Sequence, residues 1–348
     1  MVRGVTTASY AARRIPPWLA LALKVVLAAG LTVAGLESLL RLTGYGVWQD
    51  HRLPAREPVM HEPDPVRGWR NKVGTFTYPG YTPGASPITT TVGPDGARAT
   101  AARDEPHPGG TVVMVGDSFT RGWAVSDDET FAWQLAARFP AVEFRNYGTA
   151  GYGTYQSLLA LDEVLSHAGR PPRLVLYGFT DWQGIRNVAP PPWLLILTLA
   201  SHQQQVSAPY CTIAADGTLL RHPPEQYPMW PLKRYSAAIT ALEFAWAQHV
   251  SALRLPQTRP VTELLLREMQ ALSRRHGAEL VVVSLAAGSE YVSDMKSQGI
   301  HVVDCGRSLD TSSTVPGEGH PNATTHAFWG GCIGDALVRD RLLTDQGR

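Results

Sequence analysis

The pattern of apolar and polar positions divides this chain of 348 residues into three parts: one long apolar run, a polar stretch, and a region of short apolar runs separated by helix-like segments. The short runs are rich in β-branched residues and apolar with little alternation, as strands buried on both faces of a parallel sheet are. They cover residues 111–115, 142–147, 173–179, 279–285 and 300–304. The pattern predicts an α/β fold, a three-layer α/β/α sandwich with a central parallel sheet of about five strands.

The segments between these runs carry helix signals. Ser126-x-x-Glu129 is a capping-box sequence, and apolar residues follow it at helical spacing. A second helix is expected over 154–167, before Gly169. A third is expected over 260–276, where apolar residues line one face and Gly277 follows a basic last turn.

The long apolar run, from Trp18 to Leu40, has 23 residues and is interrupted by Lys24 and Glu37. That length is sufficient to span the hydrocarbon core of a bilayer if the lysine side chain extends to the headgroups. We expect a transmembrane anchor over 17–41. The basic segment 1–16 before it predicts a cytoplasmic N-terminus and an extracytoplasmic main domain at the cell membrane.

Two alternatives to the anchor stay open. A cleaved signal peptide has a similar apolar core, although no small-x-small cleavage sequence follows it here. A buried amphipathic helix is the other alternative.

Residues 45–110 are polar and rich in glycine and proline. Short β-favouring runs at 75–78 and 88–92 lie between turn sequences, which predicts hairpins. The stretch is either a small β-rich subdomain or a stalk, and the sequence does not separate the two.

Residues 189–258 form an insertion after the third predicted strand, far longer than an ordinary connection. We expect a helical cap over the crevice, with one long amphipathic helix over 235–255. Its apolar start, 190–197, is too short to cross a membrane but could instead contact the membrane surface.

Composition narrows the possible partners and cofactors. The formal net charge is +1 and no basic stripe is visible, which argues against nucleic-acid binding. Hydrophobic residues make up 44% of the chain and charged residues 18%, as expected of a packed globular protein. The three cysteines do not have metal-ligand spacing.

The strongest candidate for chemistry is Ser118, in the sequence Gly116-Asp117-Ser118 directly after the first predicted strand. A serine at the carboxyl end of a central strand faces the crevice where open α/β sheets bind ligands. An ordinary strand-ending turn has the same residue types, so other catalytic groups must decide between these interpretations.

The stretch Gly116-Asp117-Ser118-Phe119-Thr120 is similar to the first sequence block of the SGNH/GDSL hydrolases. These enzymes have a flavodoxin-like α/β/α sandwich and use a serine nucleophile to cleave or transfer esters. With two further blocks the resemblance covers roughly residues 110–340. It implies a hydrolase-like domain formed by 111–188 and 259–345.

The last block supplies the catalytic base in this family. His320, in Gly319-His320-Pro321-Asn322, follows the fifth predicted strand and resembles that base. The family has an aspartate three residues before the histidine, whereas position 317 here is glycine. Glu318, two residues before, is longer by one methylene and is expected to orient His320. The alternative is a Ser-His dyad with Glu318 in solvent.

The oxyanion hole of the family has three donors. The resemblance assigns two of them to the backbone N–H groups of Ser118 and Gly151. The third is an asparagine side chain, and Thr180 stands in its place in Gly178-Phe179-Thr180-Asp181. A threonine hydroxyl can donate one hydrogen bond but is shorter. Asn187 or Gln183 could substitute for it.

The cysteines leave a further question. Cys305 ends the fifth strand and Cys332 follows His320, so the two could form a disulfide in an extracytoplasmic domain. They could equally be two small buried apolar residues. Cys211 would then be unpaired.

The resemblance implies ester substrates on carbohydrate or lipid. For an anchored member, we expect removal or transfer of O-acetyl groups of envelope carbohydrate through a serine acyl-enzyme, with no cofactor. One alternative is a non-catalytic glycan- or partner-binding protein of envelope assembly, because the asparagine is missing and the acid is shifted. Another is a membrane-proximal lipid esterase, because the insertion begins with an apolar segment. The acyl group, hydrolysis versus transfer, and the oligomeric state stay open.

Overall fold

The computed structural model describes residues 16–49, 56–100, 107–201 and 206–344. The chain divides into two compact units. The smaller unit consists of Met1–Asp50 and Met229–Trp246, and the larger unit consists of His51–Pro228 and Ala247–Arg348.

A five-stranded parallel sheet forms the centre of the larger unit, in the order β11-β10-β7-β5-β6. Its strands are β5 (Thr111–Gly116), β6 (Glu143–Asn146), β7 (Leu174–Phe179), β10 (Glu279–Ala286) and β11 (His301–Arg307). The five apolar runs of the sequence therefore became the five strands, which confirms the predicted fold class. Successive connections leave β5 in opposite directions, so the strand order reverses between β5 and β7. Open α/β sheets bind ligands at the carboxyl ends of the strands at such a point.

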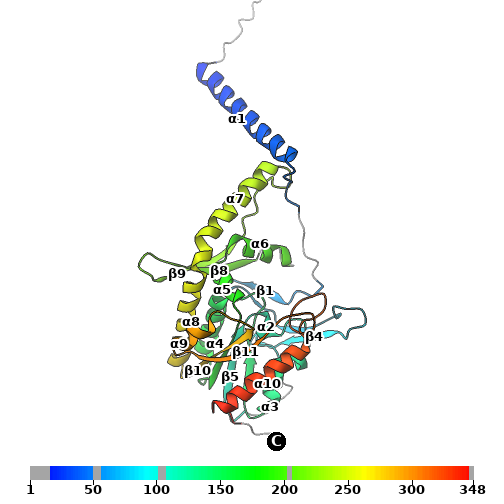
Figure 1. Ribbon diagram of the computed structural model, residues 1–348, viewed down its shortest axis with the longest axis vertical. Helices are drawn as coiled ribbons and strands as arrows, with labels where there is room; N and C mark the ends of the chain where they lie inside the picture. Colours follow the sequence, from blue (N-terminus) through cyan, green and yellow to red (C-terminus); the bar gives the residue numbers. More distant parts are fainter. Residues whose placement is uncertain (1–15, 50–55, 101–106, 202–205, 345–348) are drawn as a thin grey trace, which may run out of the picture. The chain divides into compact units, whose positions relative to one another are not determined.

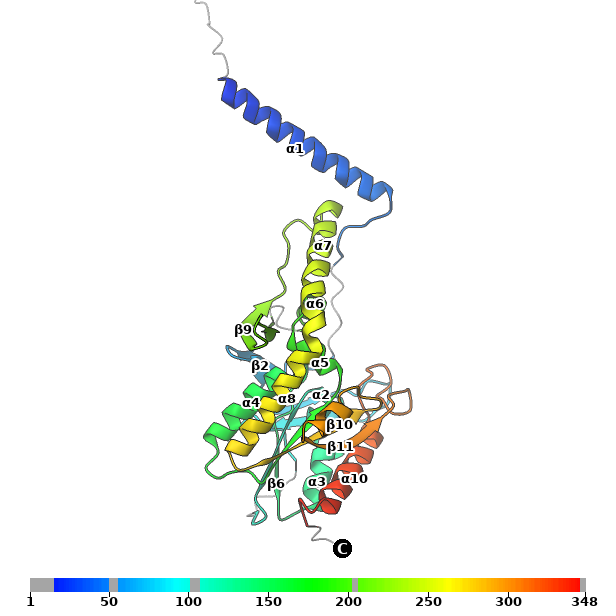
Figure 2. The same cartoon turned by 60° about the vertical axis from the view of Figure 1, so that its left-hand side comes forward.

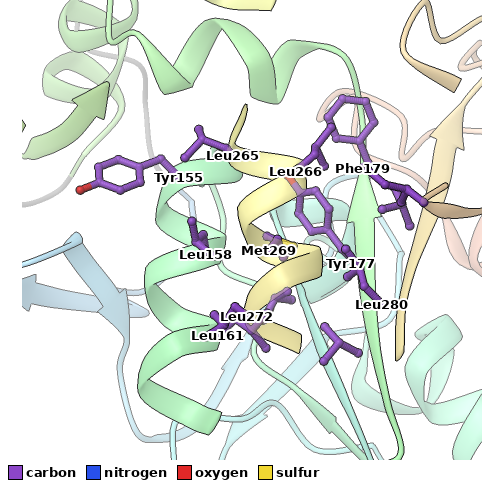
Figure 3. Packing of buried hydrophobic residues seen from close by; sticks show 14 of the residues in the cluster. Tyr155, Leu158, Leu161, Tyr177, Phe179, Leu265, Leu266, Met269, Leu272 and Leu280 are labelled. Atoms are coloured by element: carbon purple, nitrogen blue, oxygen red, sulfur yellow. The ribbon is translucent and has the colours of Figure 1, made fainter. Parts of the chain in front are cut away.

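Helices cover both faces of this sheet (Figure 2). On one face lie α4 (Thr154–His167) and α8 (Thr258–Arg275), and on the other lie α3 (Phe131–Arg138) and α10 (Ala323–Arg339). Figure 3 shows the first layer, where leucines of α4 meet Leu265 and Met269 of α8 above Tyr177 of β7. Fully buried Trp329 of α10 packs in the second layer. The three-layer sandwich follows directly from the apolar faces of these helices.

Short helical segments connect the main elements. They are α2 (Ser118–Arg121), η1 (Asp127–Glu129), α5 (Trp182–Asn187), α9 (Val292–Ser297) and η2 (Leu255–Gln257). The predicted capping box at Ser126 is present, but it begins the single turn η1. Helix α3 has its own cap, the Thr130 hydroxyl, which accepts a hydrogen bond from the Trp133 N–H.

The polar stretch before the sheet contains two antiparallel pairs (Figure 1). One is β1 (His61–Asp64) with β2 (Gly68–Asn71), and the other is β3 (Gly74–Tyr78) with β4 (Ile88–Val92). Met60, Tyr78 and Ile88 pack against Ala124, which lies in the loop after α2. The described part of this stretch therefore packs against the loop that follows α2, beside the carboxyl end of β5.

The insertion differs from the sequence expectation of a helical cap. Helices α6 (Pro191–Ala200) and α7 (Ala237–Arg254) are present, but an antiparallel hairpin of β8 (Ser207–Ile213) and β9 (Leu219–Gln226) lies between them in the chain. The Asp216-Gly217 turn, with φ +83° at the glycine, was the signal for this hairpin. Two prolines in β9 obscured the strand pattern, and a two-stranded sheet tolerates them because each of its strands is an edge.

In the smaller unit, α1 (Pro17–Leu42) carries the long apolar run. Among the described helices it alone is long and apolar enough to cross a membrane, with a mean hydropathy of 2.2 over its most apolar window. A signal sequence near an N-terminus has the same properties.

Candidate active site

The turn that carries Ser118 is shaped by two glycines. Gly116 has φ +152°, and a Cβ atom placed on it would lie 2.1 Å from Thr120 Oγ1. A Cβ on Gly178 of β7 would lie 2.0 Å from the same oxygen. Because Thr120 is inserted between the ends of β5 and β7, only glycine fits at either strand end. The chain turns directly from β5 into α2, and Ser118 is the first residue of that helix.

Asp117 holds this turn in place through hydrogen bonds of its side chain. Its side chain is fully buried, and Oδ1 accepts a hydrogen bond from the Phe119 N–H at 3.0 Å. Oδ2 accepts hydrogen bonds from Trp182 Nε1 at 3.1 Å and from Arg186 at 3.0 Å. The carboxylate thus connects the turn that carries Ser118 to α5, which follows the neighbouring strand β7.

The structure brings Ser118, His320 and Glu318 together. Ser118 Oγ lies 2.9 Å from His320 Nε2, and His320 Nδ1 lies 2.7 Å from Glu318 Oε1. Glu318 Oε2 also accepts a hydrogen bond from the backbone N–H of His320 at 2.7 Å. A carboxylate on Nδ1 holds the proton on that nitrogen and leaves Nε2 able to accept the serine proton.

The loop that presents His320 is held on several sides. The Val315 N–H donates to the His320 carbonyl at 2.7 Å, and Asn322 N–H donates to the Ser313 carbonyl at 3.1 Å. Gly317 and Gly319 have φ of +79° and +92°, so both take a left-handed conformation that other residues adopt at a cost. Aromatic rings limit the position of the imidazole, since Phe119 and Trp123 lie 5.9 and 6.2 Å from it between ring centroids.

Cys305 of β11 and Cys332 of α10 form a disulfide. The sequence left open whether these cysteines form a disulfide or are two buried apolar residues, and the structure contains the disulfide. The bond connects the strand before the His320 loop to the helix after it. Cys211 of β8 is a buried free thiol, and burial raises its pKa to about 12.

Gly151 lies in the loop that follows β6. The Thr149 N–H donates to the Gly116 carbonyl at 3.0 Å, which places this loop beside the strand end that carries Ser118. Trp69 Nε1 of β2 donates to the Ala150 carbonyl at 2.9 Å and fixes the loop from the outside. Gly151 has φ +82°, as close backbone approach often requires. Within the described part of the chain, neither the Ser118 N–H nor the Gly151 N–H donates to another group.

Thr180, which the sequence resemblance aligns with an asparagine, is 1% exposed. Its Oγ1 is buried and has no hydrogen-bond partner among the described residues. The two amides considered as substitutes are engaged elsewhere: Gln183 Nε2 donates to the Gly178 carbonyl at 3.0 Å, and Asn187 Nδ2 donates to Thr262 at 2.9 Å. Of these three side chains, Thr180 is the one with a polar atom that lacks a partner among the described residues.

Two buried arginines support the loop beyond α2. Arg98 donates to the carbonyls of Arg121 and Val125, each at 2.8 Å, and forms an ion pair with Asp127 at 2.8 Å. Arg121 donates to Asn71 Oδ1, and burial lowers its pKa to about 9. These contacts connect residues 60–98 to the turn that carries Ser118.

Sequence reasoning missed several of these positioning residues. For Trp182 and Arg186, the only sequence signal was the helical spacing after β7. The sequence contains no signal for the contact of Trp69. Asp117 was visible within its motif, but its role depends on contacts with α5.

In the described ranges, no cluster of three or more His, Cys, Asp or Glu side chains could hold a metal ion.

Comparisons with known proteins return structural neighbours. No protein-family model matches the chain, and no curated protein matches it. A GDSL-family lipolytic protein from Veillonella parvula is 12% identical, covers 66% of this chain and 98% of its own, and has a TM-score of 0.35. A putative lipolytic protein of the same family from Desulfitobacterium hafniense is 13% identical, with coverages of 67% and 99% and a TM-score of 0.38. Axe2, an acetylxylan esterase from Geobacillus stearothermophilus, is 12% identical, with coverages of 69% and 97% and a TM-score of 0.36.

Proposed function

We propose that this chain is a serine esterase or acyltransferase of the SGNH type, with Ser118 as nucleophile, His320 as general base and acid, and Glu318 as the group that orients His320. The continuous contact from Ser118 Oγ through the imidazole to the Glu318 carboxylate carries this proposal. Its parts come from two segments of the chain, since Ser118 and His320 are 202 positions apart, and a mere strand-ending turn would not require them to meet.

The chemistry follows from these distances. Ser118 Oγ attacks the acyl carbon of the ester while His320 Nε2 accepts the hydroxyl proton. Glu318 stabilises the imidazolium that forms. When the carbon–oxygen bond to the alcohol breaks, Nε2 returns the proton to the departing oxygen. Water or an acceptor hydroxyl then attacks the acyl-serine with His320 again as base, which restores Ser118.

The oxyanion of each tetrahedral intermediate needs donors. We assign this role to the N–H groups of Ser118 and Gly151 and to the Thr180 hydroxyl. All three have unused donor capacity among the described residues. Preorganised donors that gain a partner only as charge develops stabilise the transition state more than the ground state.

A small acyl group fits the surroundings of Gly151. A Cβ on this residue would lie 3.1 Å from the Trp69 ring, 3.8 Å from Trp193 and 3.8 Å from Leu197. If the Gly151 N–H binds the carbonyl oxygen, the acyl chain lies beside these side chains. Trp193 and Leu197 belong to α6 of the insertion, which therefore limits acyl length in this proposal.

We further propose that the substrate is an O-acetyl ester of envelope carbohydrate. The resemblance of the sequence blocks implies esters of carbohydrate or lipid. The apolar helix α1 supports a location at the cell membrane, and the basic segment before it supports a main domain outside. The non-catalytic alternative rested on two observations, the missing asparagine and the shifted acid. The contact between Glu318 and His320 weakens it, because the shifted acid still reaches the histidine.

The test is a comparison of initial rates on p-nitrophenyl esters with acyl chains of two to eight carbons and on acetylated oligosaccharides. The proposal predicts the highest rate for acetyl esters and none above background for Ser118→Ala. Trp193→Ala and Leu197→Ala should shift the preference toward longer chains. Equal rates for all chain lengths in these variants and the wild type would remove the assignment of α6 to acyl selection.

A further inference from the structure

Glu37 is an acidic residue near the end of an apolar helix, and the structure shows what it binds. Its carboxylate accepts hydrogen bonds from Ser236 Oγ at 2.8 Å and from the N–H groups of Ala237 and Ala238, each at 3.0 Å. Arg41 Nε donates to it at 2.6 Å. Glu37 therefore caps the first turn of α7, where unpaired N–H groups favour a negative charge. Figures 1 and 2 both show this end of α7 next to the C-terminal end of α1.

A second set of contacts joins the same two segments. The Trp48 N–H donates to the Lys233 carbonyl at 3.2 Å, and Lys233 Nζ lies 4.0 Å from the centre of the Trp48 ring. Lys233 also forms an ion pair with Glu243 at 2.8 Å, and both side chains are at most 5% exposed. Residues 229–246 are thus folded against the end of α1 within the smaller unit.

This folded segment exposes large apolar side chains. Leu232 is 65% exposed, Tyr235 76%, Leu242 53% and Phe244 58%. On α1, Leu39 and Leu42 are exposed as well. Trp230 and Trp246 lie 6.2 Å apart between ring centroids, and Arg41 and Arg234 belong to the same unit. Tryptophan, tyrosine and basic residues beside exposed leucines are typical of the interface between a bilayer and water.

We propose that residues 229–246 are an interfacial segment that lies on the bilayer α1 crosses, with Leu232, Tyr235, Leu242 and Phe244 at the boundary between headgroups and acyl chains. The proposal rests on the proposed membrane helix. Lipid is the occupant because the exposed apolar side chains continue those of α1 and because basic and aromatic residues accompany them. Glu37 and Trp48 hold the segment in place, so α1 acts as a structural part of this unit as well as an anchor.

Spin labels on the full-length protein in nanodiscs of phosphatidylcholine and phosphatidylglycerol test this arrangement. Single nitroxides are placed at Leu242→Cys and Phe244→Cys, at Val26→Cys in α1, and at the exposed position Lys296→Cys of α9. The native cysteines do not interfere, since Cys211 is buried and the other two are paired. Relaxation by oxygen, which partitions into lipid, is compared with relaxation by a water-soluble nickel complex.

The proposal predicts that labels at 242, 244 and 26 respond more to oxygen, whereas the label at 296 responds more to nickel. A lipid response at 26 with a nickel response at 242 and 244 would overturn the inference and leave the anchor intact. A nickel response at 26 would overturn both. Protection at 244 from both reagents, with dipolar broadening that falls when labelled chains are diluted with unlabelled ones, would show a second copy of the chain there and overturn lipid contact.

The role of Glu37 is tested in the same system. Glu37→Ala removes the cap of α7, so the label at 244 should become more mobile and more accessible to nickel. Glu37→Gln keeps an acceptor oxygen and should restore most of the wild-type response. A spectrum of Phe244→Cys unchanged by Glu37→Ala would overturn the positioning role of Glu37.

Discussion

Glu318 contacts two sides of His320 although only one residue separates them. Its Oε1 lies 2.7 Å from the imidazole Nδ1, and its Oε2 accepts the backbone N–H of the same histidine at 2.7 Å. The extra methylene of glutamate makes this double contact possible from a position two residues before the histidine. Gly317, one residue earlier, has φ +79°, which an aspartate would adopt at a cost.

Replacing this carboxylate tests whether it acts on the base. We expect Glu318→Gln to lower kcat by about 10²- to 10⁴-fold, because an amide N–H facing Nδ1 favours the wrong tautomer of His320. Steady-state kinetics on a p-nitrophenyl acetate substrate measures the change. Glu290→Gln, at an exposed acid of the larger unit, is the matched control and should keep wild-type rates. A Glu318→Gln enzyme with full activity would leave a Ser-His dyad as the working arrangement.

Thr180→Val tests whether the Thr180 hydroxyl is the third oxyanion donor, as we propose. The side chains have nearly the same shape, so removing a buried hydroxyl that has no partner should leave the melting temperature unchanged or slightly higher. The rate should nevertheless fall about 10²-fold if the hydroxyl donates to the oxyanion. Ser251→Ala removes another unpartnered hydroxyl, on α7, and should change neither quantity. Unchanged kcat in Thr180→Val would show that Thr180 is not part of the oxyanion hole.

Thiol titration tests the cysteine assignments. Under non-reducing conditions the folded protein should show no thiol reactive toward a disulfide reagent, because burial raises the pKa of Cys211 to about 12. In denaturant one thiol should appear, and after reduction all three cysteines should react. We expect Cys332→Ser to cost about 2–4 kcal/mol of unfolding free energy. Three thiols in denaturant without reductant would contradict the pairing of Cys305 with Cys332.

The pH dependence of stability tests whether His326 is uncharged in the folded protein. This buried histidine packs between Phe131 and Trp329. Burial, and to a lesser degree the charge of Arg98, lowers its pKa to about 3 from an ordinary value of 6.5. The unfolded chain therefore binds a proton that the folded protein does not, between pH 6.5 and about 3. The contribution of His326 to the free energy of unfolding is therefore fully present above pH 6.5. It decreases as the pH falls below that value, by up to about 1.4 kcal/mol per pH unit.

Urea unfolding at pH 7 and pH 5 measures this dependence. His326→Asn should be less stable than the wild type at pH 7 but lose less stability between the two pH values. Burial also lowers the pKa of His61, which is partly exposed, so part of the dependence should persist in the variant. His249→Asn, at an exposed position, is the control. An unchanged slope in His326→Asn would show that His326 does not contribute to acid unfolding.

The sequence predicted the parts of the molecule that depend on local pattern. Continuous apolar runs defined the five strands because both faces of a central sheet are buried. The carboxyl ends of parallel strands share one edge, which predicted that Ser118 and His320 lie close together, and their side chains are 2.9 Å apart. The contact of Glu318 was anticipated from side-chain length, which is also a local property.

Features that depend on long-range packing were not predictable in the same way. The β8–β9 hairpin was missed because two prolines obscured its second strand. Trp69 reaches Ala150 across 81 positions, and Arg98 binds the loop after α2, so neither contact leaves a periodic signal. Glu37 looked like an interruption of an apolar helix, and only the fold shows the first turn of α7 beside it.

Labelling of the purified protein with a fluorophosphonate probe, which reacts with activated serines, tests most directly whether Ser118 is a nucleophile. We expect labelling of the wild type and loss of labelling in Ser118→Ala and His320→Ala. Labelling should be retained in His326→Asn, a change at a nearby histidine that does not contact Ser118. Absence of labelling in folded wild-type protein, or labelling that persists in Ser118→Ala, would contradict an activated nucleophile at Ser118.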